Sequence, residues 1–463
     1  MSKEDLAAVL AAALAGGGDF ADLFLEERLT TTITCEDDKV ERLSTGHDVG
    51  AGLRLIFGES TAYAYTNDLT PEGLNALART VAQAARAGGR RAPVFDLRRQ
   101  PVPYDLAVQR WPDQVAVGEK VLLVERANAA ARREDGRIKQ VLVNYGDTVQ
   151  RVVMANTEGV YAEDERVRTR LAVQAVAMSN GRLQTGYEAV GSFGGLEAFE
   201  ECRPEAVAAV AARRALLMLE ARPAPTGRMA VVMAAEAGGT MIHEACGHGL
   251  EADLVQRGLS VYAGRLGEQV AVPLVTVIDD ATLAGRYGSF RFDDEATPGE
   301  KTVLIERGIL RSYMYDRLTA RREGRRSSGN GRRESYQFRP IPRMRNTYIL
   351  PGEHDAEEII RRTAKGLLVK KMGGGQVNTT NGDFVFDVAE GYLIEGGRVT
   401  APVRGATLTG NGPEVLRTVD MVGGDLGFSI GICGKNGQGV PVSDAQPTMR
   451  IPSLVVGGTA CED

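Results

Sequence analysis

The segment IHEACGH at residues 242–248 holds two of the chain's four histidines, with Glu244 directly after His243. In the zinc-binding motif H-E-x-x-H, the histidines lie four residues apart on one helix face, and the glutamate is placed to activate a metal-bound water. Here His243 and His248 lie five residues apart. At roughly 100° per residue, five residues turn the second imidazole about 140° away from the first, so a regular α-helix would not let both bind one ion.

A one-residue bulge in the helix would remove this obstacle. A π-helical turn brings residues i and i+5 to the same face, and such turns are often found at functional sites. Gly247, directly before His248, would lower the cost of the distortion. The segment therefore predicts a metal site on an overfilled helical turn. Spacing alone also fits a second interpretation, in which two partly buried helix histidines stand beside a glutamate by chance.

A catalytic zinc site needs a third protein ligand and an open position. Cysteine is the other strong zinc ligand, and Cys433 lies in the glycine-rich stretch GFSIGICGKNGQGVPVSDAQP, whose backbone can turn tightly around an ion or a substrate. His47 and His354 lie in the charged, loop-like segments STGHDVG and PGEHDAE, which favour solvated surface positions. Cys246 lies inside the histidine motif but points elsewhere on a helix, so we expect it in the core.

Cysteine usage and the N-terminus indicate the compartment. The five cysteines are odd in number and scattered, which argues against a disulfide framework and for a reducing environment. The run LAAVLAAALAGGG resembles part of a signal peptide, but Glu4 and Asp5 stand where such a peptide carries positive charge. Ser2 with Asp5 predicts a helix capping box instead. From the cysteines and this N-terminus we expect a cytoplasmic protein, and no apolar run is long enough to cross a bilayer, so we expect no membrane partner.

Two further segments are candidates for contact with a peptide. Asp293, Asp294 and Glu295 are consecutive acids before a predicted hairpin, where they could orient a metal-bound histidine, bind a peptide amine or form a solvated turn. The segment KMGGGQVNTTNGDF, which includes Gln376 and Asn378, could offer hydrogen bonds to an extended peptide that adds as a strand, or form an ordinary glycine-rich turn. We take Asp294, Glu295, Gln376 and Asn378 as candidate substrate-binding residues.

The stretch from Thr319 to Arg345 carries nine arginines against two glutamates. Nucleic-acid binding would favour such a patch with interleaved aromatic side chains, and Tyr336 and Phe338 supply a few of them. The whole chain has a net charge of −6, which gives no general attraction to nucleic acid or to anionic membranes. We therefore expect a solvated loop, or one that binds a peptide carboxylate, rather than a nucleic-acid partner.

The elements that must position these residues begin with an α+β unit at residues 1–100. The 463 residues are too many for one ordinary core, and a composition of 43% hydrophobic and 25% charged residues is that of a globular protein with two or three domains. After the first helix, alternating apolar and polar residues predict several short antiparallel strands, and residues 71–87 show helical periodicity. The stretch RRAPVFDLRRQPVPYD indicates a boundary near residue 100.

Residues 101–222 predict a second α+β unit, with a helix around 115–133, strands from 138 to about 187, and a closing helix in PEAVAAVAARRALLMLEA. After the linker RPAPTG, residues 226–463 open with the strand RMAVVMAA, contain the histidine motif, and continue mainly as hairpins such as TVLIERGILRSYMY and GYLIEGGRVTAPV. The predicted fold is therefore α+β: two smaller N-terminal α+β units followed by a β-rich C-terminal metal-binding domain.

Several segments together resemble one family. They are MIHEACGHGLEADLV, FDDEATPGEKTVLIERGIL, PIPRMRNTYILPGE, KKMGGGQVNTTNGDFVFDVAEGYLIEGG, GATLTGNGPEVL and ICGKNGQGVPVSDAQPTMRI. These segments resemble the TldD/PmbA metallopeptidases, specifically their TldD-like catalytic branch. The resemblance is weak in the first 220 residues and strong from about residue 226 onward. One departure is QGVPVS where the family usually has QSVPVG after the late cysteine motif, which leaves the metal ligand unchanged.

The resemblance implies a zinc-dependent peptidase. It implies that His243, His248 and Cys433 hold Zn²⁺ and that Glu244 is the catalytic base. The PmbA-like or TldE-like branch lacks the histidine motif, so this chain does not read as the inactive partner. Members of the family work as dimers, often of a TldD-like and a TldE-like subunit, around a cavity that admits unfolded peptide. The expected partners are therefore a TldE/PmbA-like paralogue or a second copy of this chain, and unfolded or small peptides as substrates.

We therefore expect a zinc-dependent peptidase with a metal-activated water and a glutamate base. The rival is a non-catalytic peptide-holding or regulatory protein with a structural zinc or none. Three candidate protein ligands leave a fourth position open, which favours the enzyme, whereas a fourth protein ligand would favour the rival. A DNA-binding modulator is a second rival that depends on the arginine-rich stretch alone.

Overall fold

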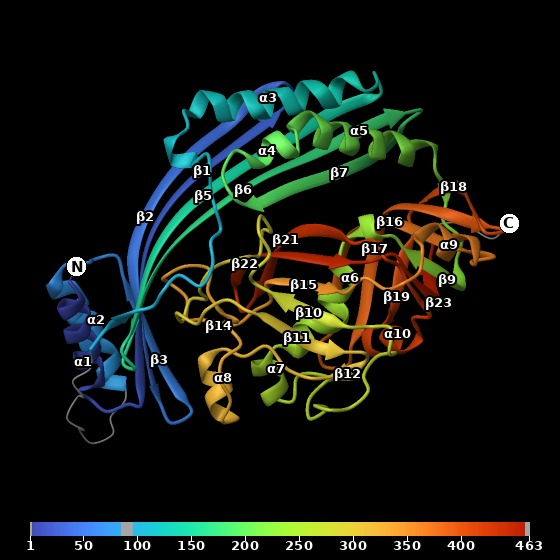
Figure 1. The fold of residues 1–463 in the computed structure, drawn as a ribbon. Coiled ribbons are helices and arrows are strands. Elements are labelled where there is room, and N and C mark those ends of the chain that lie inside the picture. The colour runs from blue at the N-terminus through green and yellow to red at the C-terminus, as the bar shows by residue number, and fades with distance from the viewer. Residues whose placement is uncertain (1, 85–95, 459–463) are drawn as a thin grey trace.

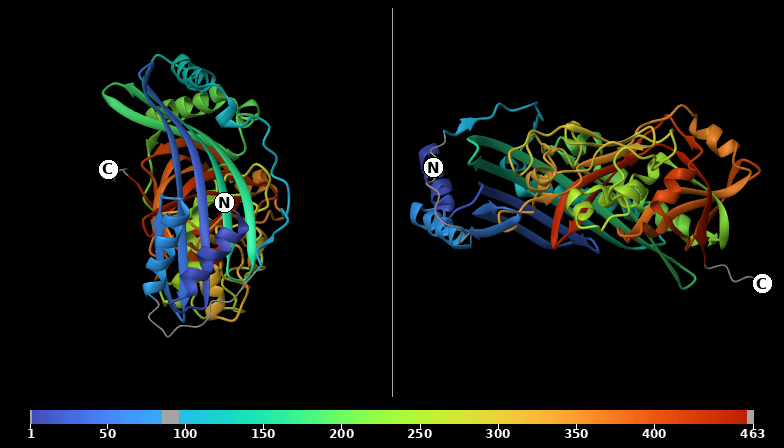
Figure 2. Two further views of the ribbon diagram at one scale, coloured as in Figure 1. Left: turned by 90° about the vertical axis from the view of Figure 1, so that its left-hand side faces the viewer. Right: turned by 90° about the horizontal axis from the view of Figure 1, so that it is seen from below.

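One long sheet carries the N-terminal half of the chain. The computed structural model describes residues 2–84 and 96–458, and residues 85–87 of the second predicted helix lie outside them. The strands of this sheet are β1 (Phe20–Glu36), β2 (Lys39–Phe57), β3 (Ser60–Thr66), β4 (Arg98–Arg99), β5 (Ile138–Asn156), β6 (Val160–Ser179) and β7 (Arg182–Phe193). They are ordered β3-β2-β1-β5-β6-β4, with β7 also paired to β6. The sheet bends as an arch over the C-terminal part of the chain (Figures 1 and 2).

The sheet crosses the boundary that was predicted near residue 100. Strand β1 pairs antiparallel with β5 along its length, so strands of both N-terminal segments lie edge to edge. The strands are also longer than the several short ones expected: β1 has 17 residues and β2 has 19. A tight turn at Asp37 and Asp38, with φ of 48° and 66°, joins them as expected for a type I′ hairpin. The boundaries near 100 and at 222–226 stay predictions.

The two faces of the sheet follow the alternation of the sequence. Odd-numbered residues such as Leu23 and Ile33 in β1 pack under helices, whereas even-numbered Phe24 packs with Phe292 and Tyr336 of the C-terminal part. The helices of the N-terminal half are α1 (Lys3–Leu14), α2 (Pro71–Ala84), α3 (Val117–Arg133), α4 (Ala198–Glu201) and α5 (Pro204–Glu220). Helices α1 and α2 cover one end of the outer face, and α3 and α5 cover the other (Figure 1).

The predicted capping box at the start of α1 is confirmed. The Ser2 hydroxyl accepts a hydrogen bond from the backbone N–H of Asp5, and the Asp5 carboxylate accepts one from the backbone N–H of Ser2.

Among residues 2–84 and 96–458, no helix combines the length and the apolar character that are needed to span a membrane.

The C-terminal part contains two large sheets. A six-stranded sheet has the order β12-β11-β10-β15-β22-β21, and an eight-stranded sheet has the order β16-β9-β23-β19-β17-β18-β8, with β20 paired to β23. Its strands are β8 (Arg222–Pro223), β9 (Gly227–Met233), β10 (Val277–Asp280), β11 (Lys301–Glu306), β12 (Ile309–Leu310), β13 (Gly331–Arg332), β14 (Ile341–Pro342), β15 (Asn346–Ile349), β16 (Lys365–Val377), β17 (Asp383–Glu395), β18 (Arg398–Arg404), β19 (Thr407–Asn411), β20 (Met421–Val422), β21 (Gly427–Lys435), β22 (Gln438–Gln446) and β23 (Met449–Gly457). Its short helices are α6 (Thr240–Ile242), α7 (Ala252–Gln256), α8 (Arg317–Arg322), α9 (Ala356–Arg361) and α10 (Gly412–Thr418).

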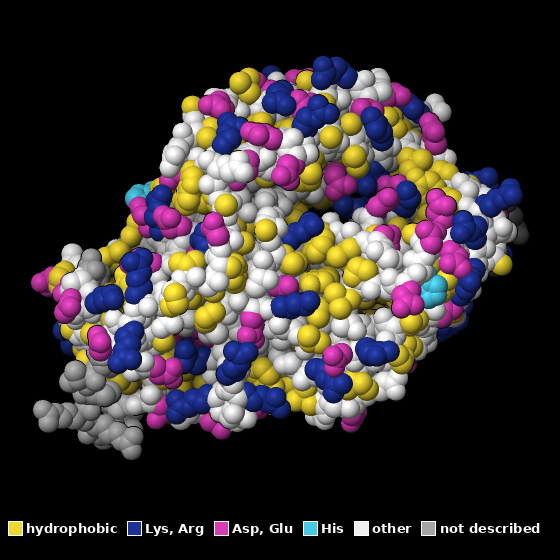
Figure 3. All heavy atoms as spheres, viewed as in Figure 1, with side chains coloured by type: hydrophobic (Ala, Val, Ile, Leu, Met, Phe, Trp, Pro, Cys, Tyr) yellow, Lys and Arg dark blue, Asp and Glu magenta, His cyan; other side chains and the backbone are white. Residues whose placement is uncertain are grey.

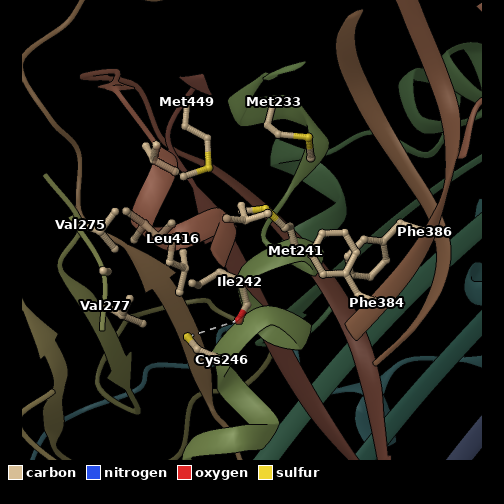
Figure 4. Close-up of a cluster of buried hydrophobic side chains, with 14 of the residues drawn as sticks. Met233, Met241, Ile242, Cys246, Val275, Val277, Phe384, Phe386, Leu416 and Met449 are labelled. Carbon is tan, nitrogen blue, oxygen red and sulfur yellow. Dashed lines mark hydrogen bonds between the residues drawn. The ribbon is translucent and has the colours of Figure 1, made fainter. Parts of the chain in front are cut away.

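The fold is therefore α+β with a β-rich C-terminal region, as predicted. Both predicted hairpins are present, and their turns place Arg307 and Gly308 at φ of 48° and 82°, and Gly396 and Gly397 at 57° and 73°. The core between the two sheets gathers side chains from both, such as Val277 of β10 and Phe386 of β17, together with Met241 of α6 (Figure 4).

The arginine-rich stretch differs from the solvated loop that was expected. Its first part, around α8, is exposed, but Arg332, Arg333, Arg343 and Arg345 are buried. Arg345 donates to the carboxylate of Asp279 at 2.6 Å. The buried arginines are accommodated because carboxylates and backbone carbonyls accept their N–H groups, as burial of charge requires.

Candidate metal centre

The histidine motif folds as the bulged turn that its spacing predicts. Helix α6 continues as a π-helical turn over His243–Gly247, and the backbone N–H of His248 donates to the carbonyl of His243. The wider turn places the two imidazoles together, with ring centroids 5.0 Å apart and planes at 84°. The bulge is confirmed, and the i,i+5 spacing is compatible with a shared ion.

Gly247 is required for a different reason from the one expected. Its φ of −52° and ψ of −62° are ordinary helical angles, so the bulge does not depend on glycine's conformational freedom. A Cβ at this position would lie 2.2 Å from the sulfur of Met344. The absence of a side chain at Gly247 therefore lets the bulged turn pack closely against the segment of Met344.

Strand β21 brings Cys433 to the two histidines. The strand forms a hairpin with β22, and the buried Cys433 sulfur lies 3.4 Å from Nε2 of His248. One ligand atom from each of His243, His248 and Cys433 lies within 4.8 Å of the other two. Cys246 instead points into the core, where its thiol donates to the carbonyl of Ile242 (Figure 4).

These three side chains fit a zinc ion. Zn²⁺ binds imidazole nitrogen and thiolate sulfur at about 2.0–2.3 Å, so tetrahedral ligand atoms lie roughly 3.5 Å apart, close to the observed separation of Cys433 and His248. Because the three ligand atoms lie within 4.8 Å of one another, a metal would need only a small contraction of the cluster.

Two buried carboxylates lie behind the histidines. Nδ1 of His248 lies 3.0 Å from a carboxylate oxygen of Glu251, and Nδ1 of His243 lies 3.6 Å from Asp444. The contact with Glu251 fixes the tautomer of His248 in which Nε2 is free to bind a metal and raises the basicity of that ring, whereas Asp444 makes no hydrogen bond to His243 and acts on it through charge alone. The sequence analysis did not find these residues, although Glu251 follows His248 by three positions.

The surrounding charges favour a thiolate. Burial alone would raise the pKa of the Cys433 thiol, but the charges of His243 and His248 and their hydrogen bonds to the sulfur lower it to about 5. Burial would likewise raise the pKa of Glu251, but the positive charges of Lys435 and His248 lower it to about 2. The ligand cysteine and the supporting carboxylate therefore both favour their ionised forms at neutral pH, and a bound metal would take the place of the imidazole protons that stabilise the thiolate.

Glu244 lies with the ligands in one cavity. This cavity measures about 550 Å³ and is lined by His243, Glu244, His248 and Cys433 together with residues of β7, β16 and β17. It lies between the arch and the C-terminal part, where the surface is hollowed (Figure 3). Burial raises the pKa of the half-buried Glu244 carboxyl. Glu244 therefore lines the same cavity as the three ligand residues and is a candidate base there.

The candidates Asp294 and Glu295 lie elsewhere. Both are buried and neither lines the cavity of the histidines. Asp294 accepts a hydrogen bond from Arg166 of β6 at 2.5 Å, and Glu295 accepts one from Arg54 of β2 at 2.6 Å. The solvated turn that the sequence allowed is therefore wrong for these two residues, because arginines of the arch bury and neutralise their carboxylates. These carboxylates connect the arch to the C-terminal part.

The candidates Gln376 and Asn378 line a neighbouring hollow of about 1290 Å³ between β16, β17 and β19. Gly374 lines this hollow and also the cavity of the histidines. The two spaces therefore border each other along β16.

The other two histidines lie apart from the metal centre. Exposed His47 lies 3.1 Å from Glu27, and His354 contacts the carbonyl of Val422.

Sequence reasoning also missed the wall that the arch contributes. Tyr187 and Glu188 of β7 line the cavity, and Glu188 forms an ion pair with Lys371 of β16 at 2.7 Å. Nothing in the sequence pairs these residues, because their contact depends on how the arch lies over the C-terminal part.

Comparison with known proteins agrees with this geometry. The model of PmbA/TldA metallopeptidase domain 1 matches residues 21–87, that of the central domain matches residues 110–219, and that of the C-terminal domain matches residues 226–458. The centre built from His243, His248 and Cys433 lies within the C-terminal match.

Individual relatives cover nearly the whole chain. A metalloprotease TldD homolog of Haemophilus influenzae is 38% identical over 450 residues, which cover 95% of this chain and 93% of that protein. A zinc metalloprotease TldD homolog of Saccharolobus solfataricus is 27% identical over 443 residues, which cover 96% of this chain and 97% of that protein.

Two solved structures share the fold. A putative modulator of a DNA gyrase from Thermotoga maritima has a TM-score of 0.80 at 23% identity and covers 98% of this chain and 100% of that one. TldE from Thermococcus kodakarensis has a TM-score of 0.75 at 17% identity, with coverage of 98% and 100%. From the three matching family models and the identity to TldD homologs along the chain, this protein belongs to the PmbA/TldD family of metallopeptidases, in its TldD-like branch.

Proposed function

We propose that this protein is a zinc-dependent peptidase that hydrolyses unfolded or small peptides. The observation that carries the proposal is the convergence of His243, His248 and Cys433 within 4.8 Å, with Glu244 in the same cavity. In the part of the chain that the structure describes, the cluster contains these three candidate ligands and no fourth. Three protein ligands are typical of a catalytic zinc site, whereas structural zinc usually has four.

When bound, a zinc ion supplies a Lewis acid with an open coordination position. The chain's own residues do the rest. Glu251 holds the His248 imidazole through its contact with Nδ1, and the Asp444 carboxylate lies 3.6 Å from Nδ1 of His243. Glu244 stands next to His243 and accepts the proton of the attacking water, then delivers it to the leaving amine. The cavity walls from β7 and β16 keep this proton transfer away from bulk water.

The cavity suits an extended peptide rather than a folded protein. Its volume of about 550 Å³ corresponds to a few residues of chain, and it is enclosed by the arch on one side. The neighbouring hollow that contains Gln376 and Asn378 is a continuation for a longer peptide. Substrates must therefore be unfolded or small, and we retain these two residues as candidates for peptide contact.

We further propose a dimer in the cytoplasm, either with a TldE-like paralogue or with a second copy. Support comes from the TldE structure, which shares this fold along the whole chain. Light scattering checks the assembly: a mass near that of one 49.6 kDa chain, both alone and with a TldE-like protein present, would contradict it.

The function is tested by removing and restoring the metal. Purified protein is treated with a chelator, then supplied with one equivalent of Zn²⁺, and cleavage of an unfolded peptide is followed by mass spectrometry. We expect cleavage to disappear and return with the metal. Peptide binding that depends on zinc without any cleavage would favour the non-catalytic peptide-holding alternative. Intact folding in the chelated sample, checked by circular dichroism, separates a catalytic from a structural zinc.

A further inference from the structure

Two buried arginines beneath the arch have no carboxylate partner. Arg168 of β6 donates from Nε to the carbonyl of Tyr287 at 2.9 Å and from Nη2 to that of Ser289 at 2.8 Å. Arg332 of β13 donates to the carbonyls of Met344 and Pro441. Within residues 2–84 and 96–458, neither guanidinium forms an ion pair, whereas neighbouring Arg166 and Arg333 contact carboxylates.

These two charges line a common hollow. It measures about 370 Å³ and lies between β6 of the arch and the C-terminal part. Its wall carries five arginines, which are Arg28, Arg166, Arg168, Arg332 and Arg333, against three acids, which are Asp293, Asp294 and Glu334. Arg28, Arg166 and Arg333 each lie within 4.0 Å of a carboxylate, so the unpaired positive charge of the wall lies on Arg168 and Arg332. Burial and the positive charge of neighbouring arginines lower the pKa of Arg168 to about 10 and that of Arg332 to about 9.

The backbone carbonyls accept hydrogen bonds from both guanidiniums but carry no opposite charge, so an anion in the hollow would offset the remaining cost of burying the two positive charges. The carbonyls leave Nη1 of Arg168 and Nε of Arg332 without a partner among the described residues, and a charged arginine N–H is a strong donor to a carboxylate oxygen. Both residues are less than one-tenth exposed, so their positions are fixed by packing and by the carbonyls they contact.

The arginine hollow borders the metal cavity. Ile432, which is 56% exposed, lines both spaces and directly precedes the ligand Cys433 in β21. Pro441, opposite Ile432 in the β21–β22 hairpin, lines the arginine hollow and accepts from Arg332. A peptide that lies across the metal cavity therefore reaches the arginines by passing Ile432.

We propose that Arg168 and Arg332 form a subsite for the C-terminal carboxylate of the peptide substrate. The inference rests on the proposed peptidase function and adds the orientation in which the peptide binds. A peptide held by its terminal carboxylate places a bond near its C-terminus at the metal, so the enzyme favours free C-terminal ends and releases short C-terminal fragments. Interior segments of long chains are poorer substrates.

The test compares one unstructured ten-residue peptide as the free acid and as the C-terminal amide. Binding is measured by calorimetry on the Glu244→Gln protein, so that no cleavage disturbs the equilibrium. Because hydrogen bonds to a charged group are stronger than neutral ones, we expect the acid to bind roughly ten- to a hundred-fold more tightly than the amide. Equal affinities would overturn the proposal.

Variants then locate the subsite. In the same Glu244→Gln background, Arg168→Gln and Arg332→Gln should each remove most of the preference for the acid. Arg339→Gln, at an exposed arginine of the same stretch that lines neither space, should keep it. Each arginine variant tests the site separately. If thermal unfolding shows that one variant does not fold, the other variant still tests the site. A preference that persists in the folded variants would overturn the assignment.

The outcomes separate this proposal from the peptidase function. A zinc-loaded protein that cleaves the acid and the amide with equal kcat/KM would keep the peptidase and refute the subsite. A protein that cleaves neither but binds the acid more tightly, with the preference lost in the arginine variants, would refute the peptidase and keep the subsite.

Discussion

Replacing Glu251 by glutamine tests how far the metal centre depends on residues behind its ligands. Glu251 is fully buried, and one of its oxygens, Oε2, lies 3.0 Å from Nδ1 of His248 and 3.1 Å from Nζ of Lys435. A glutamine carbonyl in the place of Oε2 accepts both hydrogen bonds but carries no charge. The amide NH₂ then takes the place of Oε1, which lies 3.8 Å from Nε of Arg343 and has no hydrogen-bond partner among the described residues. The substitution therefore removes mainly the negative charge.

The size of the effect follows from that charge. Without it, His248 is a less basic ligand, and the positive Lys435 is less well neutralised. Loss of a carboxylate that supports a metal-bound histidine typically costs 10- to 100-fold in metal affinity, or about 1.4–2.8 kcal/mol. Because Glu251 is fully buried and solvent cannot screen the loss, we expect the upper part of this range.

The assay is a zinc titration in competition with a chromogenic chelator at pH 7. Glu268→Gln provides the matched control, because Glu268 is exposed and forms a surface ion pair with Arg265. We expect weaker zinc binding in Glu251→Gln and unchanged binding in the control. An unchanged dissociation constant in folded Glu251→Gln protein would refute the argument that this carboxylate supports the metal site.

Two further predictions concern a ligand and a buried acid cluster. Cys433→Ser should lose most of its zinc in elemental analysis, since a neutral hydroxyl is a far poorer ligand than a thiolate. The control variant Cys246→Ser should keep its zinc. Full zinc retention in Cys433→Ser would exclude Cys433 as a ligand. Burial and the charge of Glu295 raise the pKa of Asp293 to about 8 and that of Asp316 to about 7. The folded protein therefore binds more protons than the unfolded chain between about pH 4 and these values. As the pH rises through that window, the free energy of unfolding falls by up to about 1.4 kcal/mol per pH unit for each carboxyl. Urea midpoints at pH 5 to 8 should show this decline, and Glu295→Gln should flatten it; a midpoint that rises with pH in the parent protein would contradict the raised values.

The local features of the site could be predicted from sequence because they depend on neighbours in the chain. The bulged turn was expected from the five-residue spacing of His243 and His248 if both bind one ion. The hairpin of Cys433 was not predicted, although Asn436-Gly437 at its turn is a local hairpin signal. The two hairpins and the α1 cap were also predictable, since turn and cap chemistry are local.

Long-range features could not be predicted in the same way. The arginines of the stretch 319–345 look like a solvated loop in sequence, but their partners, such as Asp279 for Arg345, come from distant strands. Asp294 and Glu295 resemble an exposed turn until the arch supplies Arg166 and Arg54. No periodicity encodes these ion pairs, because they join residues far apart in the sequence: Arg345 directly precedes β15, which pairs with the strand of Asp279, and Asp294 and Glu295 contact strands of the arch.

The extent of the arch was also hidden in the sequence. Strands β1 and β5 contain polar residues on both faces, so alternation alone suggested several short strands. The polar residues on the inner face are paired with the C-terminal part: Glu26, for example, accepts the backbone N–H of Tyr336. The strand length therefore depends on a partner surface that the local pattern does not contain.

The most direct test of the central claim is peptide cleavage by Glu244→Gln at matched zinc content. Glu244 lies in the metal cavity but is not among the three clustered ligands, so the variant should bind zinc and peptide as the parent does. Loss of a general base typically lowers the rate by about 10²- to 10⁴-fold. We predict that zinc-loaded Glu244→Gln cleaves an unfolded peptide at close to the background rate, and cleavage at the parent rate would contradict the proposed mechanism.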